Sequence, residues 1–416
     1  MNAVSAGAGL RGRVLARIPR GAKQQVKTGL VDLRRQAPAS LVRTAEKRAG
    51  RVVATPQLLD RAAQARPTPP QTPTRLWVGP ANFAGQGDAW ARAVERHLGD
   101  PEVGATSMSV AGPIRFPVDY EVEPEVFRDL AWQREQLTAL RGWTHVLVEA
   151  ERPVTGTLFA DCAAEARALE RLGLLVAHLS HGSDIRAPDV HAATHPHSPF
   201  TDPSDPRVVR LQRLTDRNGP YLRESGRPSF VSTPDLLDHA PDAIWCPVVV
   251  DADLWATDTT PLYRDRPIVV HAPSNGWLKG SDLIDPLMTE LHEAGVVEYR
   301  TLRGLDRAGM LREYREADIV LDQFVLDLYG VAAAEAMAAG RVVVASVGES
   351  VRARVREACG EEVPIVEAGP DDLVEVIHGI LDDRDAARTT AAAGPGFVRR
   401  VHDGTRSAQA LATFLG

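Results

Sequence analysis

The chain has 416 residues, which at about 150 residues per domain predicts two or three domains. Its hydrophobic fraction of 44% and charged fraction of 25% are ordinary for globular proteins and exclude a wholly disordered, collagen-like or coiled-coil chain. Aromatic residues make up only 5% of the chain, which argues against a nucleic-acid-binding protein built on stacking platforms.

The three cysteines, Cys162, Cys246 and Cys359, lie far apart in the sequence and form no CxxC pair. Neither a disulfide framework nor a zinc site is therefore expected. No apolar run reaches the roughly 18 to 20 residues that span a bilayer, and the first residues lack the pattern of a secretory signal. We expect a cytoplasmic protein.

Residues 1–74 differ from the rest of the chain in charge. Up to Arg66 there are fourteen Lys and Arg against three Asp and Glu, a net +11 in a chain whose formal net charge is −7. Apolar residues recur at helical spacing from Leu10 to Ile18, and a second helical stretch is expected over 30–51. The proline-rich segment 67–74 predicts a stiff extended linker. Two interpretations stay open for residues 1–66: a peripheral contact with the inner face of a membrane, or an extension packed on the main body.

After the linker, short apolar runs alternate with helical stretches, as in the βαβ units of a parallel sheet. In chain order we expect a strand at 75–79, a glycine-containing loop at 82–87, a helix at 88–98, strands at 105–110 and 144–148, a helix at 159–172 and a strand at 174–179.

The same alternation restarts near Arg266. We expect strands at 267–271, 297–302, 319–321 and 341–346, and helices at 281–294, 306–316, 330–339, 350–359, 370–382 and within 397–415. The sequence therefore predicts an α/β protein with two Rossmann-like doubly wound domains facing a central cleft, preceded by a basic N-terminal extension. The expected segments are 1–74 (arm and linker), 75–250 (N-terminal domain), 251–395 (C-terminal domain) and 396–416 (helices packing back toward the N-terminal domain).

Lysine is rare in this chain. Only four of the 48 basic residues are lysines, and Lys279 is the only one after residue 47. An ammonium group is a compact point charge that a guanidinium fork does not replace. Lys279 is therefore a candidate functional residue.

The strongest local pattern is the segment 322–340, DQFVLDLYGVAAAEAMAAG, which holds Asp327, Gly330 and Glu335. A carboxylate among small apolar helical residues is costly to bury, so Glu335 needs a ligand hydroxyl or a cation. Gly330 stands at the turn into this helix, where backbone N–H groups bind anions such as phosphate. The alternative is that Glu335 only pairs with an arginine or caps a neighbouring loop.

Together these residues resemble the donor-sugar motif of family-4 retaining glycosyltransferases of the GT-B fold. The motif is carried by Asp327, Glu335, 336–340 (AMAAG) and the apolar strand 342–346. Further similarities extend from about Arg75 to the C-terminus: HAPSN at 271–275 followed by Lys279 and Gly280, the glycine loop 85–87, and the loop HGSDIR at 181–186.

The resemblance implies a metal-independent retaining glycosyltransferase with no cofactor and a nucleotide sugar as co-substrate, UDP or GDP sugars first. It implies that Glu335 accepts hydrogen bonds from the ribose hydroxyls, Asp327 holds hydroxyls of the donor sugar, and Lys279 neutralises the diphosphate. His181 would contact the transferring sugar. The residues implied in cradling phosphate are Gly85, Gly87, Gly330 and Val331, with Ser274 in the same phosphate-binding region.

Two residues depart from the family's pattern. Asp327 replaces the usual glutamate, and Ser274 stands where an arginine is usual, with Arg186, Arg303 and Arg307 as candidate replacements for that cation. The histidines between 191 and 197 invite a metal interpretation, but their proline-broken spacing favours a surface loop, and we expect no metal.

The acceptor stays open between a lipid-linked or cell-envelope glycan precursor and a small molecule, and no nucleic acid is expected. The alternatives to a glycosyltransferase are a GT-B epimerase or phosphorylase, and a non-catalytic scaffold that binds nucleotide sugars.

Overall fold

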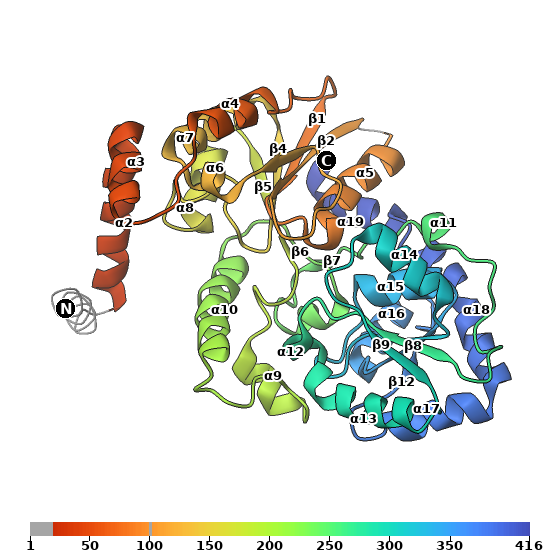
Figure 1. The fold of residues 1–416 in the computed structure, drawn as a ribbon. Coiled ribbons are helices and arrows are strands. Elements are labelled where there is room, and N and C mark those ends of the chain that lie inside the picture. Colours follow the sequence, from red (N-terminus) through yellow and green to blue (C-terminus); the bar gives the residue numbers. More distant parts are fainter. Residues whose placement is uncertain (1–19, 100–101) are drawn as a thin grey trace, which may run out of the picture.

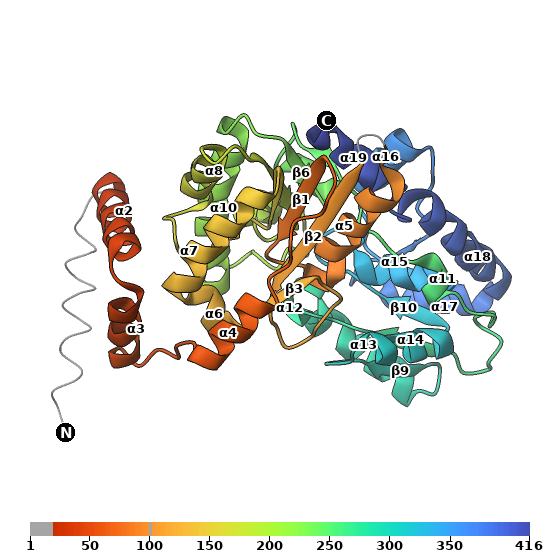
Figure 2. The same ribbon diagram turned by 90° about the horizontal axis from the view of Figure 1, so that it is seen from above.

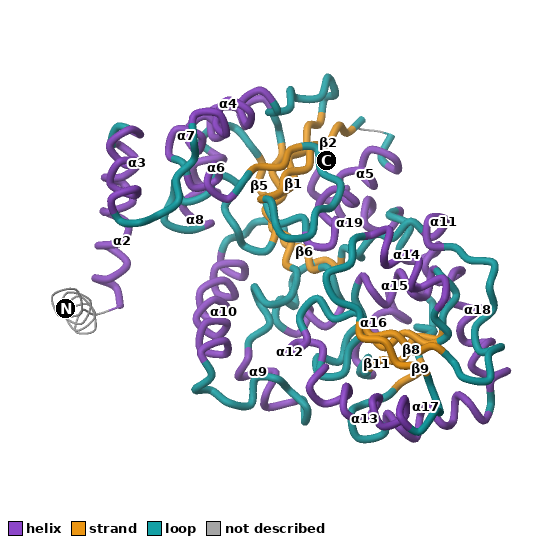
Figure 3. The backbone as a smooth tube through the Cα atoms, in the orientation of Figure 1, coloured by secondary structure: helices purple, strands orange, loops and turns teal. Residues whose placement is uncertain are grey.

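The computed structural model describes residues 20–99 and 102–416. The chain forms two α/β domains, each with one sheet, and a pair of helices that stands apart at the N-terminal side (Figures 1 and 3). The helical spacing between Leu10 and Ile18 lies outside the described residues.

The N-terminal domain is built on a seven-stranded parallel sheet in the order β3-β2-β1-β4-β5-β6-β7. The strand order reverses between β1 and β4, which is the point where doubly wound sheets bind ligands. The strands are β1 (Thr74–Gly79), β2 (Val103–Val110), β3 (Tyr120–Val122), β4 (His145–Glu149), β5 (Leu175–Ser180), β6 (Ser229–Val231) and β7 (Ile244–Trp245).

The C-terminal domain has a five-stranded parallel sheet in the order β12-β11-β10-β8-β9, with its reversal between β8 and β10. Alternate residues of these strands enter the two core clusters on opposite faces of the sheet, as in a strand buried on both sides. The strands are β8 (Ile268–His271), β9 (Glu298–Thr301), β10 (Ile319–Leu321), β11 (Val342–Ala345) and β12 (Val366–Glu367).

Helices cover both faces of each sheet. The N-terminal half of the chain contains α2 (Arg20–Gln36), α3 (Ala39–Arg48), α4 (Pro56–Gln64), α5 (Gln86–His97), α6 (Pro124–Arg128), α7 (Leu130–Ala139), α8 (Cys162–Glu170), α9 (Pro188–Thr194) and α10 (Pro206–Glu224), of which α2 and α3 stand apart from the sheet. In the C-terminal half they are α11 (Ala252–Trp255), α12 (Gly276–Lys279), α13 (Ser281–Glu293), α14 (Arg307–Glu316), α15 (Val331–Ala338), α16 (Glu349–Cys359), α17 (Leu373–Asp382), α18 (Arg384–Val401) and α19 (Thr405–Leu415). The expected alternation of strands and helices in a two-sheet α/β fold is confirmed, whereas the sequence did not anticipate β3, β6, β7 and β12 or the helices α4, α6, α7, α9, α10, α11 and α12.

The segment expected as a separate arm and linker is partly integrated into the N-terminal domain. In α4, Ala62 belongs to the domain core, and its carbonyl accepts a hydrogen bond of 3.0 Å from the Tyr120 hydroxyl. The proline-rich linker is packed down as well, since a Cβ on Gly142 would come within 2.3 Å of Pro69. The packed domain therefore begins before Arg75, where we had placed its boundary.

Helices α2 and α3 are held to the surface mainly by polar contacts. Arg43 pairs with Asp129 at 2.9 Å, and Arg34 donates to the Gln133 side chain at 3.0 Å. The two helices lie beside α7 and away from the C-terminal domain (Figure 2).

The chain crosses between the domains twice, and the two crossings are tied together. After β7 it enters the C-terminal domain, and α19 returns to pack on α5. The buried His402 ring donates from Nδ1 to the Val248 carbonyl at 2.8 Å, and Val250 N donates to the His402 carbonyl at 2.8 Å. These bonds fix how the two reversal points face each other.

Candidate active site

Two cavities lie between the domains, and a third, lined by residues 83–217 alone, adjoins them on the N-terminal side. The nucleotide-sized cavity, about 490 Å³, is lined from both domains, by Gly85 and Gln86 on one side and by Lys279 and Glu335 on the other. The connecting cavity, about 250 Å³, shares Ser274, Lys279 and Val331 with it. The arginine cavity, about 930 Å³, shares Phe83, His181 and Ser183 with the connecting cavity.

Lys279 stands at the reversal point of the C-terminal sheet. Its ammonium group donates to Asp322, which directly follows β10, and Asp322 is buried. The second Asp322 oxygen has no partner within the described residues. The lysine is therefore held in place by a carboxylate while it lines both the nucleotide-sized and the connecting cavity.

The N-terminus of α15 opens onto the same space. Gly330 is the N-cap, it provides no side-chain cap, and a Cβ on it would meet no atom within 4 Å. Gly330 and Val331 both line the connecting cavity. The free N–H groups of the first turn can therefore bind an anion.

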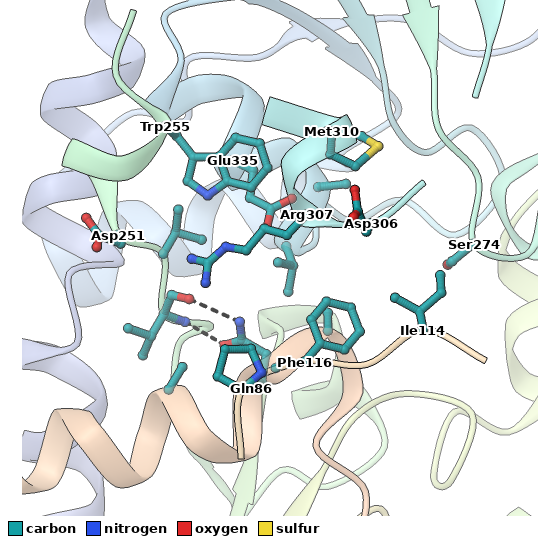
Figure 4. A pocket seen from close by; sticks show the side chains of 18 of the residues that line it. Gln86, Ile114, Phe116, Asp251, Trp255, Ser274, Asp306, Arg307, Met310 and Glu335 are labelled. Atoms are coloured by element: carbon teal, nitrogen blue, oxygen red, sulfur yellow. Dashed lines mark hydrogen bonds between the residues drawn. The ribbon is translucent and has the colours of Figure 1, made fainter. Parts of the chain in front are cut away.

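Glu335 projects from α15 toward the nucleotide-sized cavity, where Trp255 and Met310 form an apolar wall (Figure 4). Burial raises the pKa of Glu335 to about 8, nearby Asp322 adds to the rise, and the charge of Arg307 opposes it. Arg307 extends into the same cavity. Of the three candidate replacements for the missing arginine, Arg307 alone lines this cavity, because Arg186 is bound to Asp235 and Arg303 lines none of the three.

At the reversal point of the N-terminal sheet, the glycine loop expected to cradle phosphate surrounds a buried carboxylate. Glu149, the last residue of β4, accepts hydrogen bonds from Ala81 N at 3.2 Å and Asn82 N at 3.0 Å. A Cβ on Gly87 would lie 2.7 Å from Glu149 Oε2, so this glycine makes room for the carboxylate. Gly87 lines none of the three cavities, whereas Gly85 lines the nucleotide-sized one.

His181 lies where the connecting and arginine cavities meet. Its Nε2 is 3.1 Å from Glu149 Oε1, and its ring packs against Phe83 and Trp90 with centroid distances of 5.2 and 5.3 Å. Asp184 accepts from the backbone N–H of His181 at 3.1 Å. The imidazole is thus fixed on several sides with one edge facing the cavities.

Asp327 does not join this group. Its side chain bonds to the Ser346 hydroxyl and lies 3.6 Å from His195 Nε2, and it lines none of the three cavities. The histidine segment is also more ordered than the surface loop we expected, because His191 is buried in α9 and stacks on His195. Within residues 20–99 and 102–416, no cluster of three or more His, Cys, Asp or Glu side chains could hold a metal ion.

Three functional candidates were missed at the level of sequence. Glu149 ends an apolar strand and Asp322 directly follows one. An acidic residue at the carboxyl end of a strand is the sequence pattern that could have indicated both. Gln86 shows no such signal: its buried amide donates to the Val249 carbonyl at 3.0 Å and accepts from Val249 N at 2.7 Å, joining α5 to the interdomain segment (Figure 4).

No protein-family model matches this chain, and no curated protein matches its sequence. Solved structures match its fold. The sucrose-phosphate synthase from Thermosynechococcus elongatus is 14% identical with a TM-score of 0.53, and the match covers 81% of this chain and 96% of that one. HepE from Anabaena, solved in complex with UDP and glucose, is 12% identical with a TM-score of 0.51, covering 81% and 98%. A glycosyltransferase from Rickettsia africae is 11% identical with a TM-score of 0.50, covering 82% and 97%.

The chain therefore has the two-domain fold of these proteins. The GT-B architecture expected from the sequence resemblance is confirmed at the level of the fold.

Proposed function

We propose that this protein is a metal-independent retaining glycosyltransferase that transfers a sugar from a nucleoside-diphosphate sugar to an acceptor held by the N-terminal domain. The observation that carries the proposal is the pair of cavities between the facing reversal points, which share Lys279, together with the adjoining arginine cavity, which shares His181 with one of them. HepE, which shares the fold, was solved with UDP and glucose. UDP sugars are accordingly the first donors to test, followed by GDP sugars.

In this proposal the nucleotide occupies the nucleotide-sized cavity and its sugar the connecting cavity. Glu335 accepts hydrogen bonds from the ribose hydroxyls, and Lys279 with the first-turn amides of α15 faces the diphosphate. Arg307 supplies the charge that Ser274 lacks. Asp327 must turn from the Ser346 hydroxyl, to which it is hydrogen-bonded, to reach a donor sugar.

The chemistry is a same-face displacement. The acceptor oxygen bonds to the anomeric carbon as the bond from that carbon to the phosphate oxygen breaks, and the acceptor proton passes to the departing phosphate oxygen. Retention of configuration then needs no protein nucleophile. The ammonium of Lys279 stabilises the negative charge that develops on the leaving diphosphate, which is where preorganised charge contributes most.

The test is the release of UDP or GDP from a panel of sugar nucleotides. We expect slow release by the wild-type chain and a loss of roughly 100-fold or more in Lys279→Ala, the range measured for removal of one charge-stabilising group. Glu335→Ala should weaken nucleotide binding. Lys47→Ala, which alters an exposed lysine of α3, is the matched control and should leave release unchanged.

The alternatives give different results in the same assay. A phosphorylase would require orthophosphate, and an epimerase would turn over its donor without any acceptor. Nucleotide binding with no release under any condition would contradict the enzyme and favour a scaffold.

We further propose that α2 and α3 give this enzyme a peripheral contact with the cytoplasmic face of a membrane. Both helices carry exposed apolar side chains among their basic residues, and Leu30, Leu33 and Leu41 are each more than 60% exposed. No helix within the described ranges is long and apolar enough to span a membrane.

Leu30→Asp with Leu33→Asp should abolish co-sedimentation with anionic liposomes. The control Leu283→Asp changes an exposed leucine of the C-terminal domain and should still sediment. Equal sedimentation of both variants and the wild-type chain would contradict the membrane contact.

A further inference from the structure

The arginine cavity is the largest of the three and has no role in binding the donor. One wall is α10, where Arg210, Arg213 and Arg217 follow at intervals of three and four residues and so share one face of the helix. Another part of the lining is the loop after β4, where the Arg152 guanidinium lies over the Phe83 ring at 4.8 Å. Four guanidinium groups from two separate segments therefore surround one space.

The three arginines of α10 form no ion pair within the described residues, whereas Arg152 lies in the electrostatic field of Asp184 and Glu149. Across the described parts of the chain, Arg217 bonds only to the neighbouring Asn218 side chain, at 3.0 Å. Asp184 is the one acidic residue that lines the cavity, and its carboxylate already accepts from the backbone N–H of Gly182 at 2.6 Å. By contrast, exposed arginines such as Arg356 and Arg400 are paired with glutamates.

The cavity also reaches the centre of the proposed reaction. It shares His181 and Phe83 with the connecting cavity, so a molecule in the arginine cavity touches the space of the donor sugar. The remaining lining is mixed, with the hydroxyls of Ser183 and Ser204 near the aliphatic Val209 and Leu214. A polar acceptor of moderate size fits such a lining.

We propose that the acceptor carries a phosphate or pyrophosphate group, which Arg210, Arg213, Arg217 and Arg152 bind while the acceptor hydroxyl faces the donor sugar beside His181. The inference rests on the proposed function and deepens it. Guanidinium forks bind phosphate oxygens in pairs, and a concave site lined by one sign of charge raises the local concentration of an anion. The phosphate stays on the acceptor throughout, because the bond that forms joins its hydroxyl oxygen to the anomeric carbon.

The test measures binding to the full chain saturated with UDP, so that phosphate probes do not report on the nucleotide-sized cavity. The probes are glycerol 3-phosphate, a hexose 6-phosphate and dodecyl phosphate micelles, each compared with its neutral counterpart by calorimetry. At least one phosphate probe should bind roughly tenfold or more tightly than its counterpart. Binding of a soluble ester identifies a small-molecule acceptor, and binding of the micellar probe alone identifies a lipid phosphate.

Matched variants distinguish the effect of the cavity arginines from that of changing any arginine of α10. Arg210→Gln with Arg213→Gln should weaken phosphate binding roughly tenfold or more. Arg223→Gln, an exposed arginine of α10 that does not line the cavity, should bind as the wild type does. Thermal stabilisation by UDP should be equal in the wild type and both variants, since none of the three substituted arginines lines the nucleotide-sized cavity.

Two results would overturn the proposal while UDP still binds: equal affinity for phosphate and neutral probes, or equal loss in the double variant and in Arg223→Gln. Failure of the wild-type chain to bind any sugar nucleotide is a separate readout and would instead remove the proposed donor chemistry.

Discussion

Glu149 joins three parts of the N-terminal domain through one carboxylate. It accepts from Ala81 and Asn82 in the loop after β1, faces Gly87 at the start of α5, and lies 3.1 Å from His181 Nε2. We interpret it as a positioning residue for His181, because it lines none of the cavities itself.

Glu149→Gln keeps the side-chain volume but replaces an acceptor oxygen with an amide that donates, so one N–H group loses its partner. We expect kcat to fall about 10- to 100-fold, as when a hydrogen bond to a charged group is lost, with little change in the KM of the donor. Steady-state kinetics with the preferred sugar nucleotide measure both.

The control is Glu151→Gln, which alters a buried carboxylate two residues away that faces His178 at 3.0 Å. Its kcat should stay near that of the wild type. If both variants lost kcat and thermal stability equally, damage to the domain would explain the effect and the positioning role would be wrong.

We predict that nucleotide affinity depends on pH through the protonation of Glu335. Its pKa of about 8 leaves the side chain mainly protonated at pH 6, whereas ribose hydroxyls donate to the carboxylate. Affinity for UDP should therefore rise from pH 6 to about 8, by at most about tenfold per pH unit, and then level off. Calorimetry at pH 6, 7, 8 and 9 measures this, and Glu335→Gln should lose the part of the rise due to this group.

The same residue affects the empty protein in the opposite direction. The folded chain keeps the Glu335 proton to a higher pH than the unfolded chain, so stability from this group is present at low pH and is lost as the pH rises toward about 8. Thermal melting of the wild type and of Glu335→Gln at several pH values tests this. A difference in melting temperature between the two chains that did not change with pH would contradict it.

At the scale of elements, α15 is placed by close contact with α18. A Cβ on Gly394 of α18 would lie 2.6 Å from the Met337 carbonyl oxygen, so only a glycine allows this approach. The contact lies two residues along the helix from Glu335, so it helps to fix how far α15 stands from the cavity.

Gly394→Ala should destabilise the protein by about 1–3 kcal/mol through overpacking. Gly379→Ala in α17 should have the opposite effect, because nothing lies within 4 Å of its Cβ and alanine favours a helix by about 0.5–1 kcal/mol. Denaturant unfolding of both variants measures the change in the free energy of unfolding. A stabilising effect of Gly394→Ala would contradict the close contact.

At the scale of the whole molecule, the two domain crossings meet at His402. Burial lowers the pKa of this ring to about 4, and the Tyr329 hydroxyl donates to its Nε2 at 3.1 Å. The ring is therefore neutral in the folded protein at neutral pH, and its two hydrogen bonds hold the segment after α18 against the Val248 carbonyl and the Tyr329 hydroxyl.

Acid should loosen this junction. Between pH 6.5 and about 4 the unfolded chain binds a proton at this histidine that the folded chain does not, so stability is lost as the pH falls, by at most about 3 kcal/mol. His402→Gln should lose less stability between pH 7 and 4.5 than the wild type. The exposed His378→Gln is the control and should follow the wild-type curve.

The sequence by itself determined the alternation of strands and helices, the acid in the alanine-rich α15 and the single lysine of the C-terminal domain. These features are local: hydrophobic period, helix-start residues and the cost of burying a charge are all recorded in neighbouring residues. The tertiary structure decided which groups meet. Glu149 reaches His181 and the glycine loop, Asp322 holds Lys279, and α10 faces Arg152, because strand order and domain packing bring together residues that are tens of positions apart in the chain.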